Sequence, residues 1–488
     1  MKELTAIIHS FSKKEAEMYK RLYGSGNPKE PTKPEELFDL IFSKTVTNDR
    51  EVIKAMYGAA KAGVSAFSHL KKKLRDQLTI VLIAADADKS EEDEVDFNFM
   101  LRKVAKQFLE ARVFVNRGNA AMALEVLKKA YKDAKEYEVF IFLPNIAMTL
   151  AGQQFSRDEK YLNELRKTQD WALDAQAKYV QAENMLWSLA APNIMFKNRE
   201  QESLENAKQV ARKLREFFET THSDNIHFQY LEAQLFVAEL ERKQTEAVSI
   251  AEDRFQLVNS SRALKRTATI RSTRNQLLNA YLNAQQFDKA FALAHANIND
   301  VSFAHALTFG DLGFRAALYD GKLNQSIAFL ELYKKHPKFI KDEPATAKYW
   351  YFMAGLAFAK KDYKNVFTHL NKTGWMLKDR IGWGLGVKLL EILTYIEMGE
   401  MDLVLFRIKA LWQLLYRNPQ KNVARIKAIS SILYALLQSG FNYRKVNERE
   451  KKKMKELRDA QGVFYWDPTG FEIIRFDWWM DEKMKRVR

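Results

Sequence analysis

Long segments of helical periodicity, with few interruptions, constrain this chain more than any other feature of its sequence. Its 488 residues include only 18 glycines and 9 prolines, the residues that most often form turns. A sheet-rich fold would need turn signals about every eight to twelve residues. From about residue 97 onward, one apolar pattern of helical period follows another, as in GNAAMALEVLKKAYKDAKEYE (118–138). The sequence therefore predicts an all-α fold.

The helical segments share an internal pattern. After each turn comes a small or medium-sized residue at the place where two antiparallel helices would cross. These positions are Ala123, Ala247, Ala290, Ser326, Val366 and Val404. From 247 onward they are 36 to 43 residues apart, and two or three unaligned units fit between 123 and 247. Because one helix pair cannot bury its apolar face alone, we predict an α-solenoid of antiparallel helix pairs over residues 97–440.

Residues 104–137 resemble the tetratricopeptide repeat (TPR), a helix pair of about 34 residues. Ala111 and Phe114 match the small and aromatic positions of its first helix, and Gly118 matches its turn, whereas Gln107 stands where the repeat usually has tryptophan. The resemblance implies degenerate TPR-like repeats, with HEAT-like or irregular helix pairs as the alternative. The whole layout is also similar to a group of uncharacterised TPR-like proteins from Bacteroidetes-type bacteria, which supplies no activity.

Both flanks of the predicted solenoid differ from it. Residues 1–90 predict a helical subdomain, with one long helix before a proline-rich break at 24–34 and three short helices after it. Residues 441–488 begin with a helix whose stretch 443–458 carries eight basic and three acidic residues. Seven aromatic residues follow between 464 and 479, too many to leave in water. We expect them to cap the open end of the solenoid core, with a docking patch as the alternative.

Composition and motifs point away from several classes of protein. The formal net charge of +16 permits an anionic partner without requiring one. Cysteine is absent, which excludes disulfides, thiolate zinc sites and cysteine nucleophiles. The eight histidines form no metal-binding motif, no phosphate loop or nucleophile elbow occurs, and GWGLG (382–386) follows no predicted strand. We predict a protein that is not an enzyme and uses no metal, cofactor or small-molecule substrate.

The sequence also bears on the membrane. Its most apolar run, LTIVLIAA (78–85), is far shorter than the roughly 20 residues that span a bilayer. The first residues, MKELTAIIHSFSKKEAEMYK, contain no uninterrupted apolar core of the signal-peptide type. We therefore expect no membrane span and a location in the cytoplasm.

A polar stripe in the repeat near residue 280 predicts a binding surface. Its asparagines recur every four residues, so they share one helical face, and their side chains both donate and accept hydrogen bonds as a peptide backbone does. Two arginines beside them could receive a carboxylate, and comparable inner positions recur two repeats later. The candidates are Arg271, Arg274, Asn275, Asn279, Asn283, Lys348 and Tyr351. We predict a non-catalytic scaffold or adaptor that binds a protein or peptide partner on its concave face, with a polar face that has no ligand as the alternative.

The N-terminal subdomain suggests a second function, binding to nucleic acid. Two short helices precede GVSAFSHLKKKLRDQL (63–78), an order that resembles a helix-turn-helix or winged-helix unit with its third helix in the DNA major groove. The candidates are Ser65, Ser68, His69, Lys71, Lys72 and Arg75. On this hypothesis the protein is a DNA-binding regulator whose repeats sense a partner. On the structural alternative, Phe67, Leu70, Leu74 and Leu78 are simply the core face of a basic helix.

Overall fold

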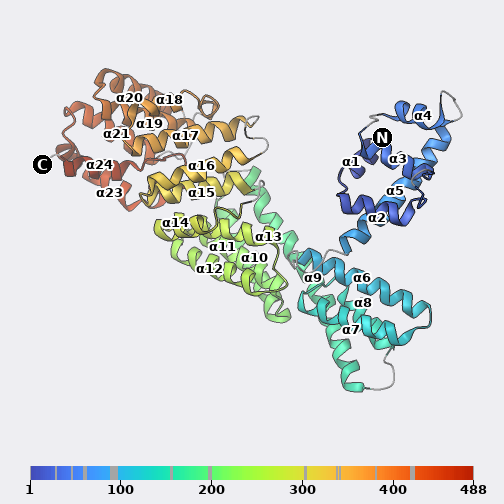
Figure 1. Ribbon diagram of the computed structural model, residues 1–488. Helices are drawn as coiled ribbons and strands as arrows, with labels where there is room; N and C mark the ends of the chain where they lie inside the picture. Colours follow the sequence, from blue (N-terminus) through green and yellow to red (C-terminus); the bar gives the residue numbers. More distant parts are fainter. Residues whose placement is uncertain are drawn as a thin grey trace. The chain divides into compact units, whose positions relative to one another are not determined.

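The computed structural model describes residues 2–27, 30–44, 48–58, 63–87, 97–153, 158–195, 200–301, 305–336, 339, 342–379, 382–417 and 424–486. These residues form 24 α-helices and no strand, which confirms the all-α prediction (Figure 1). The chain divides into two compact units, residues 1–176 (unit 1) and 177–488 (unit 2), and the division falls within helix α9. None of the described helices is long and apolar enough to cross a membrane.

Unit 1 begins with five helices around one apolar core. Their bounds are α1 Lys2–His9, α2 Lys13–Tyr23, α3 Lys33–Phe42, α4 Asp49–Tyr57 and α5 Gly63–Ala87. Tyr19, Phe38 and Leu74 are fully buried between them. The prediction of one long N-terminal helix is wrong, because Ser12 and Glu15 form a reciprocal capping box that starts α2. Unit 1 continues with α6 Phe97–Asn116, α7 Ala120–Glu136, α8 Leu143–Gln153 and the first part of α9 Glu159–Met195.

Unit 2 is a stack of antiparallel helix pairs. Its helices are α10 Glu200–Thr221, α11 Asp224–Leu240, α12 Gln244–Ser260, α13 Thr267–Asn283, α14 Phe287–Ala296, α15 Ala306–Tyr319, α16 Leu323–Lys335, α17 Glu343–Ala359, α18 Tyr363–Leu370, α19 Trp383–Met398, α20 Met401–Tyr416, α21 Ala424–Gln438, α22 Tyr443–Arg449, α23 Lys451–Asp459 and α24 Phe476–Arg486. From α10 to α21 each helix packs against the next one along the chain. The predicted α-solenoid is therefore confirmed.

The turns inside the pairs share one backbone geometry. Each has a residue of positive φ; these are Gly118, Arg242, Gln285, Gly321, Lys361, Gly399 and Gly440. The N–H that follows donates to the carbonyl five residues earlier, as from Lys243 to Ala238 at 2.9 Å. This bond closes the first helix in a Schellman motif. Since three of the seven positions are not glycine, the glycine pattern alone does not mark every turn.

The predicted crossing positions are buried where paired helices meet. All six, from Ala123 to Val404, are at most 1% exposed. Val446 in α22 is equally buried after the turn at Gly440, so the pair α21–α22 extends the series by one unit that the sequence pattern missed. Between residues 138 and 224 the described chain forms three helices, α8 to α10, because α9 alone takes 37 residues.

The domain limits predicted from the sequence differ from the two units of the structure. The limit between 90 and 97 falls on residues 88–96, which lie outside the described residues. Helices α6 to α8 belong to unit 1 together with α1 to α5, so the first predicted repeat shares a unit with the N-terminal subdomain. Residues 441–486 belong to unit 2, where they return to helices that lie far earlier in the chain.

Candidate partner-binding face

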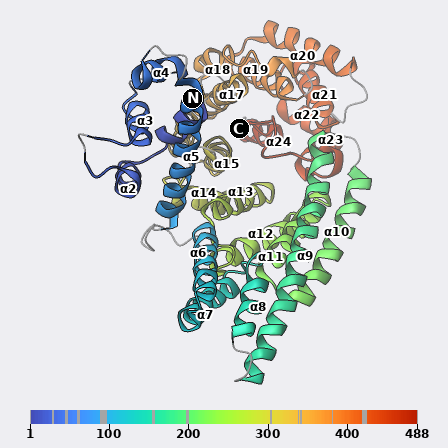
Figure 2. The same ribbon diagram turned by 90° about the vertical axis from the view of Figure 1, so that its right-hand side faces the viewer.

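We call the side of unit 2 that contacts the C-terminal segment, residues 461–486, its inner face. It is formed by α15, α17, α19 and α21 and by the turns after α11 and α13. The C-terminal segment crosses this face, and Figure 2 shows α24 inside the arc of helices α15 to α21. Trp466, Ile473, Phe476 and Met480 are almost fully buried there. The aromatic residues therefore cover several pairs from the inside, whereas we predicted a cap on the end of the core.

Side-chain donors on the inner face hold backbone carbonyl groups of this segment. The donors are Arg242 to the Gly462 carbonyl, Arg315 to Pro468 at 2.7 Å, Tyr319 to Pro468 at 3.2 Å and Tyr351 to Phe471. They come from the turn after α11 and from α15 and α17, so they follow the segment across three pairs. The inner face thus binds an irregular segment of polypeptide, with a 3-10 helix at Gly462–Phe464, through donors that do not depend on the side chains of that segment.

Two glycines let the C-terminal segment approach the helices closely. A Cβ atom on Gly386 would lie 2.3 Å from the carbonyl oxygen of Phe471, and one on Gly355 would lie 2.9 Å from the Ile473 side chain. Gly386 belongs to the GWGLG stretch, which lies at the start of α19 and packs closely. Glycine is needed at these positions because the segment occupies the space of a side chain.

Replacing Gly386 with alanine should therefore loosen the segment. We expect Gly386→Ala to lower the free energy of unfolding by about 1–3 kcal/mol, since backbone must move. Urea unfolding measures this loss, and limited proteolysis reports exposure of residues 461–486. Gly152→Ala is the matched control, because Gly152 is also helical and a Cβ there meets nothing within 4 Å. Equal stability of the two variants would contradict the prediction.

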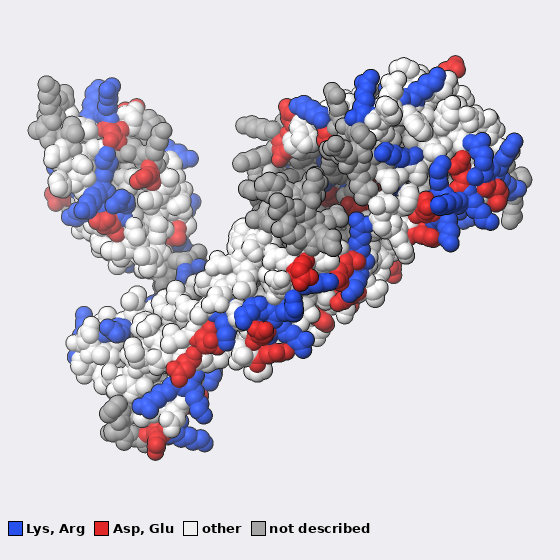
Figure 3. Space-filling view, turned by 180° about the vertical axis from the view of Figure 1, so that it is seen from behind, with Lys and Arg blue, Asp and Glu red and all other residues white. Residues whose placement is uncertain are grey.

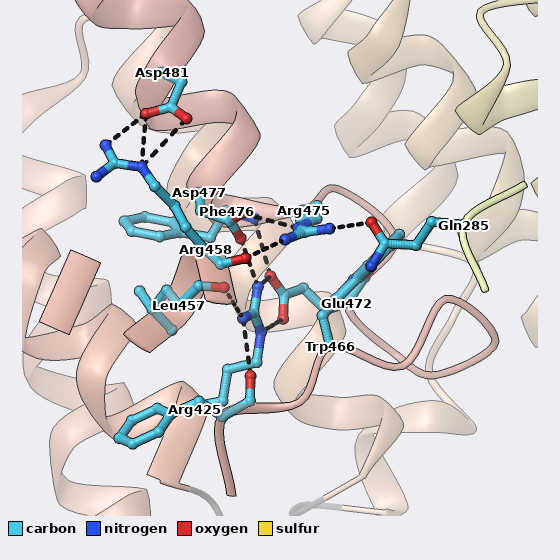
Figure 4. A network of polar contacts seen from close by, with 11 residues as sticks. Gln285, Arg425, Leu457, Arg458, Trp466, Glu472, Arg475, Phe476, Asp477 and Asp481 are labelled. Carbon is cyan, nitrogen blue, oxygen red and sulfur yellow. Dashed lines mark hydrogen bonds and ion pairs between the residues drawn. The ribbon is translucent and has the colours of Figure 1, made fainter. Parts of the chain in front are cut away.

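A buried ionic network fixes the C-terminal segment to α21 (Figure 4). Arg425 binds both carboxylate oxygens of Glu472, at 2.6 and 2.9 Å, and one oxygen of Asp477 at 2.8 Å. Arg475 donates to the other oxygen of Asp477 at 2.9 Å. Arg475 also reaches the Gln285 side chain at 2.8 Å and the Arg458 carbonyl at 3.1 Å. Two cations thus neutralise two anions, and all four side chains are at most 7% exposed.

Removing one member of the network should be costly. Arg425→Leu leaves the Glu472 and Asp477 carboxylates buried with one cation between them, so we expect a loss of about 3–5 kcal/mol in stability. Urea unfolding followed by circular dichroism measures it. Arg417→Leu, at an exposed position after α20, serves as the control. A loss below about 1 kcal/mol, typical of surface ion pairs, would show that the network does not hold the segment.

Sequence reasoning missed these four charged residues. The sequence did contain a signal for three of them, because Glu472, Arg475 and Asp477 lie among apolar and aromatic residues in GFEIIRFDWW. Charged side chains inside an apolar segment that is destined for burial must find partners of opposite charge. The sequence gives no indication that the partner is Arg425, 47 positions before Glu472.

The structure places the predicted arginines in an internal contact. Arg271 and Arg274 donate to the Asp300 carboxylate at 2.5 and 3.0 Å, and Arg274, only 1% exposed, also binds the Asn297 side chain. Hydrogen bonds and ion pairs from both arginines lower the pKa of Asp300 below its usual range. The two arginines that we predicted to receive a partner's carboxylate are instead paired with a carboxylate of the chain itself.

The predicted asparagines lie on one helix but in different surroundings. Asn275 is 9% exposed, and its Oδ1 is buried without a hydrogen-bond partner, as is Oδ1 of Asn283. Asn279 hydrogen-bonds the side chain of Glu239 on α11. These side chains belong largely to the packing between α11 and α13, and no open amide ladder is formed by them.

Lys348 and Tyr351 lie in different parts of the inner face, one open and one covered. Tyr351 is fully buried beneath the C-terminal segment. Lys348, one helical turn earlier, lines a cavity of about 430 Å³ between the N-terminal halves of α15 and α17 and the start of α19. Trp375, Trp383 and Asp311 also line it. We call this cavity the Lys348 cavity.

The charges at the Lys348 cavity are unequal. Asp311 forms ion pairs with Lys348 and with Arg315, the latter at 2.5 Å. Burial alone would raise the pKa of Asp311, but the two cations outweigh it and hold the pKa below its usual range. The Lys348 ammonium also lies 4.9 Å from the ring centre of Trp383. Lys348 and Arg315 share the Asp311 carboxylate, and the Asp467 carboxylate also acts on Arg315, so Lys348 is left as the partly exposed cation of the cavity.

The residues predicted for DNA binding lie on α5. Ser65, Ser68, His69, Lys72 and Arg75 are exposed on it. Lys71 instead pairs with Asp49 of α4 at 2.8 Å. The opposite face, with Phe67, Leu70, Leu74 and Leu78, belongs to the core, as the structural alternative requires. The turn between α4 and α5, on which a helix-turn-helix depends, falls partly on residues 59–62, outside the described residues.

No part of the described chain groups three or more His, Asp or Glu side chains in a way that suits a metal ion. The inner face offers hydrogen-bond donors, paired charges and aromatic rings. No protein-family model matches the chain, and no curated protein is significantly similar to it in sequence.

Proposed function

We propose that the protein is a non-catalytic scaffold or adaptor that binds a protein or peptide partner on the inner face of unit 2. The observation that carries the proposal is the Lys348 cavity, which stays open beside a segment of polypeptide that the same face already holds. A stack of helix pairs presents such a face without any inherent chemistry. We further expect the protein in the cytoplasm, on the sequence features given above.

The cavity suggests what a partner would present. Trp375 and Trp383 offer apolar walls, and Lys348 offers a cation that is 30% exposed. A partner segment that inserts an apolar side chain next to an acidic residue would use both features. Aromatic walls around one charged anchor are typical of the residues that dominate binding at protein interfaces.

Lys348→Met should weaken partner binding and leave the fold intact, because Asp311 keeps its ion pair with Arg315. The test is affinity purification of the tagged full-length protein from its own cells with nuclease present, followed by quantitative mass spectrometry. We expect at least about a tenfold loss of the bound partner, as for one truncated interface anchor.

The matched control is Lys364→Met, since Lys364 is an exposed lysine on α18. Equal recovery of partners by the two variants would show that the partner does not bind at the Lys348 cavity. If no protein survives nuclease treatment with the wild-type chain, the scaffold proposal itself fails.

One observation favours a second function, DNA binding by unit 1. Ser68, His69, Lys72 and Arg75 share the exposed side of α5, where phosphate contacts would form. We expect Lys72→Glu with Arg75→Glu to lower affinity for duplex DNA by about tenfold or more, and the wild-type affinity to fall steeply with salt. Fluorescence anisotropy with the full-length protein measures both. Lys13→Glu with Lys14→Glu, exposed on α2, is the control; an equal effect of both pairs would indicate non-specific attraction only.

A further inference from the structure

Helix α20 exposes three aromatic side chains on the outside of unit 2. Phe406 is 64% exposed, Trp412 47% and Tyr416 85%. Leu403 on the same helix is also exposed. Single apolar residues on a surface are ordinary, but several large ones on one helix indicate a surface that is covered by something else.

A cavity lies beside these side chains. It encloses about 510 Å³ between α20 and α21, and Trp412, Leu415 and Tyr416 form its apolar wall. Two polar groups of α21 complete it, the exposed Lys427 and the buried Ser430. The Ser430 hydroxyl has no hydrogen-bond partner. Among the described residues, the cavity therefore combines an apolar wall with a hydroxyl and an ammonium group.

Helix α21 joins this aromatic surface to a basic one. Its exposed side chains include Lys427 and Tyr434, seven residues apart and thus on one face. Next to Ser430, the Ser431 hydroxyl accepts a hydrogen bond from Lys453 of α23 at 2.8 Å. Helix α21 packs against both α20 and α23. Lys427 and Tyr434 lie on the side of α21 opposite the buried Arg425, so this side faces away from the C-terminal segment and connects the aromatic residues of α20 to the basic helix α23.

Positive charge is concentrated on this part of the chain. Residues 401–458 contain fourteen Lys and Arg against four Asp and Glu, a net charge of +10 out of +16 for the whole chain. The exposed basic residues of α22 and α23 are Arg444, Lys445, Arg449, Lys451, Lys452 and Lys455. Figure 3 shows many Lys and Arg, with some Asp and Glu among them, at the right-hand end, which is the end that carries α23 and α24 in Figure 1.

We propose that this outer surface of α20, α21 and α23 docks the protein on an anionic lipid bilayer. Aromatic side chains with lysines and arginines beside them are the features by which helices bind at the boundary between headgroups and acyl chains. The aromatic rings enter that boundary while the long basic side chains reach the phosphates. The cavity matches the same ligand, since its apolar wall suits an acyl chain, and Ser430 and Lys427 suit an anionic headgroup.

Lipid explains the surface better than the other anionic partners do. A nucleic acid would use the lysines and stack bases on exposed rings, but it would leave the apolar cavity empty. An acidic protein would need its own matching shape, and the exposed rings of α20 project outward along the helix from Phe406 to Tyr416. A bilayer offers an apolar interior and an anionic surface. The aromatic side chains of this surface suit the first, and its basic side chains suit the second. The docking is independent of the partner proposed for the inner face.

The test is co-sedimentation of the full-length protein with two kinds of vesicle. One is pure phosphatidylcholine, and the other contains about one third phosphatidylglycerol, which makes its surface anionic. We expect binding to the anionic vesicles alone, and its loss when salt is raised, because salt screens exposed charges. Two variants then divide the surface: Phe406→Ser with Tyr416→Ser, and Lys451→Glu with Lys452→Glu and Lys455→Glu.

Each variant should lower the affinity for anionic vesicles by at least about tenfold. In the lysine variant the reason is that each basic residue near such a surface contributes about fivefold. In the aromatic variant the reason is the loss of apolar area that would be buried in the bilayer boundary. Two controls match them. Trp187→Ser removes another exposed aromatic side chain, and Lys322→Glu with Lys335→Glu and Lys364→Glu makes the same change in net charge elsewhere on unit 2. The controls should bind like the wild type, and circular dichroism should show all variants folded.

Three results would overturn the proposal. The first is an absence of binding to both kinds of vesicle. The second is equal binding by the variants and their controls, which would place the contact elsewhere. The third is self-association of the protein without lipid, seen by analytical ultracentrifugation and abolished by Phe406→Ser with Tyr416→Ser; the surface would then be an interface between two copies of the chain.

Discussion

The ion pairs of Arg425 with Glu472 and Asp477 are the interaction on which the inner face of unit 2 depends. Buried charges of this kind add little net stability when compared with a well-packed apolar core, but they allow few alternative positions. Because a carboxylate buried without a guanidinium is costly, we expect these ion pairs to fix the register of the C-terminal segment. That register in turn brings the Phe471 carbonyl to Tyr351 and leads the backbone past Gly386.

The fixed segment leaves only part of the inner face uncovered for the partner that we propose. It covers the C-terminal end of α15 and the middle of α17, where Tyr319 and Tyr351 bind its carbonyl groups. The N-terminal halves of the same helices keep the Lys348 cavity. A solenoid of this length would otherwise present one long groove with little selectivity. With the segment in place, the face offers a smaller site with defined chemistry.

The sequence predicted the helix pairs because their signal is local. A crossing residue such as Ala290 and the apolar period around it are set by neighbours within a few turns of helix. The start of α2 was also readable, since SKKE at 12–15 has the spacing of a capping box, but the apolar pattern that runs across it hid the break. Turns at Arg242, Gln285 and Lys361 were harder to find, because these residues carry a positive φ without being glycine.

The candidate site was less predictable, because its contacts are not local. Periodicity placed the polar residues of α13 on one helix, but it cannot show that Asp300 satisfies Arg271 and Arg274. Nor can it show that the Tyr351 hydroxyl donates a hydrogen bond to the Phe471 carbonyl, 120 positions later in the chain. A helical period identifies a face that needs a partner, and the identity of the partner follows only from the packed chain.

The path of the C-terminal segment has a consequence for how unit 2 is made. Repeat proteins usually need only contacts between neighbouring repeats, so they can fold progressively as the ribosome releases them. Here the side chains of Arg242 and Gln285 form hydrogen bonds with Gly462 and Arg475, which are synthesised 220 and 190 residues later. Helices α11 to α21 therefore emerge with the inner face uncovered, and a chaperone or a partner can reach it during translation. After residues 461–486 have docked, that face is no longer free along its whole length.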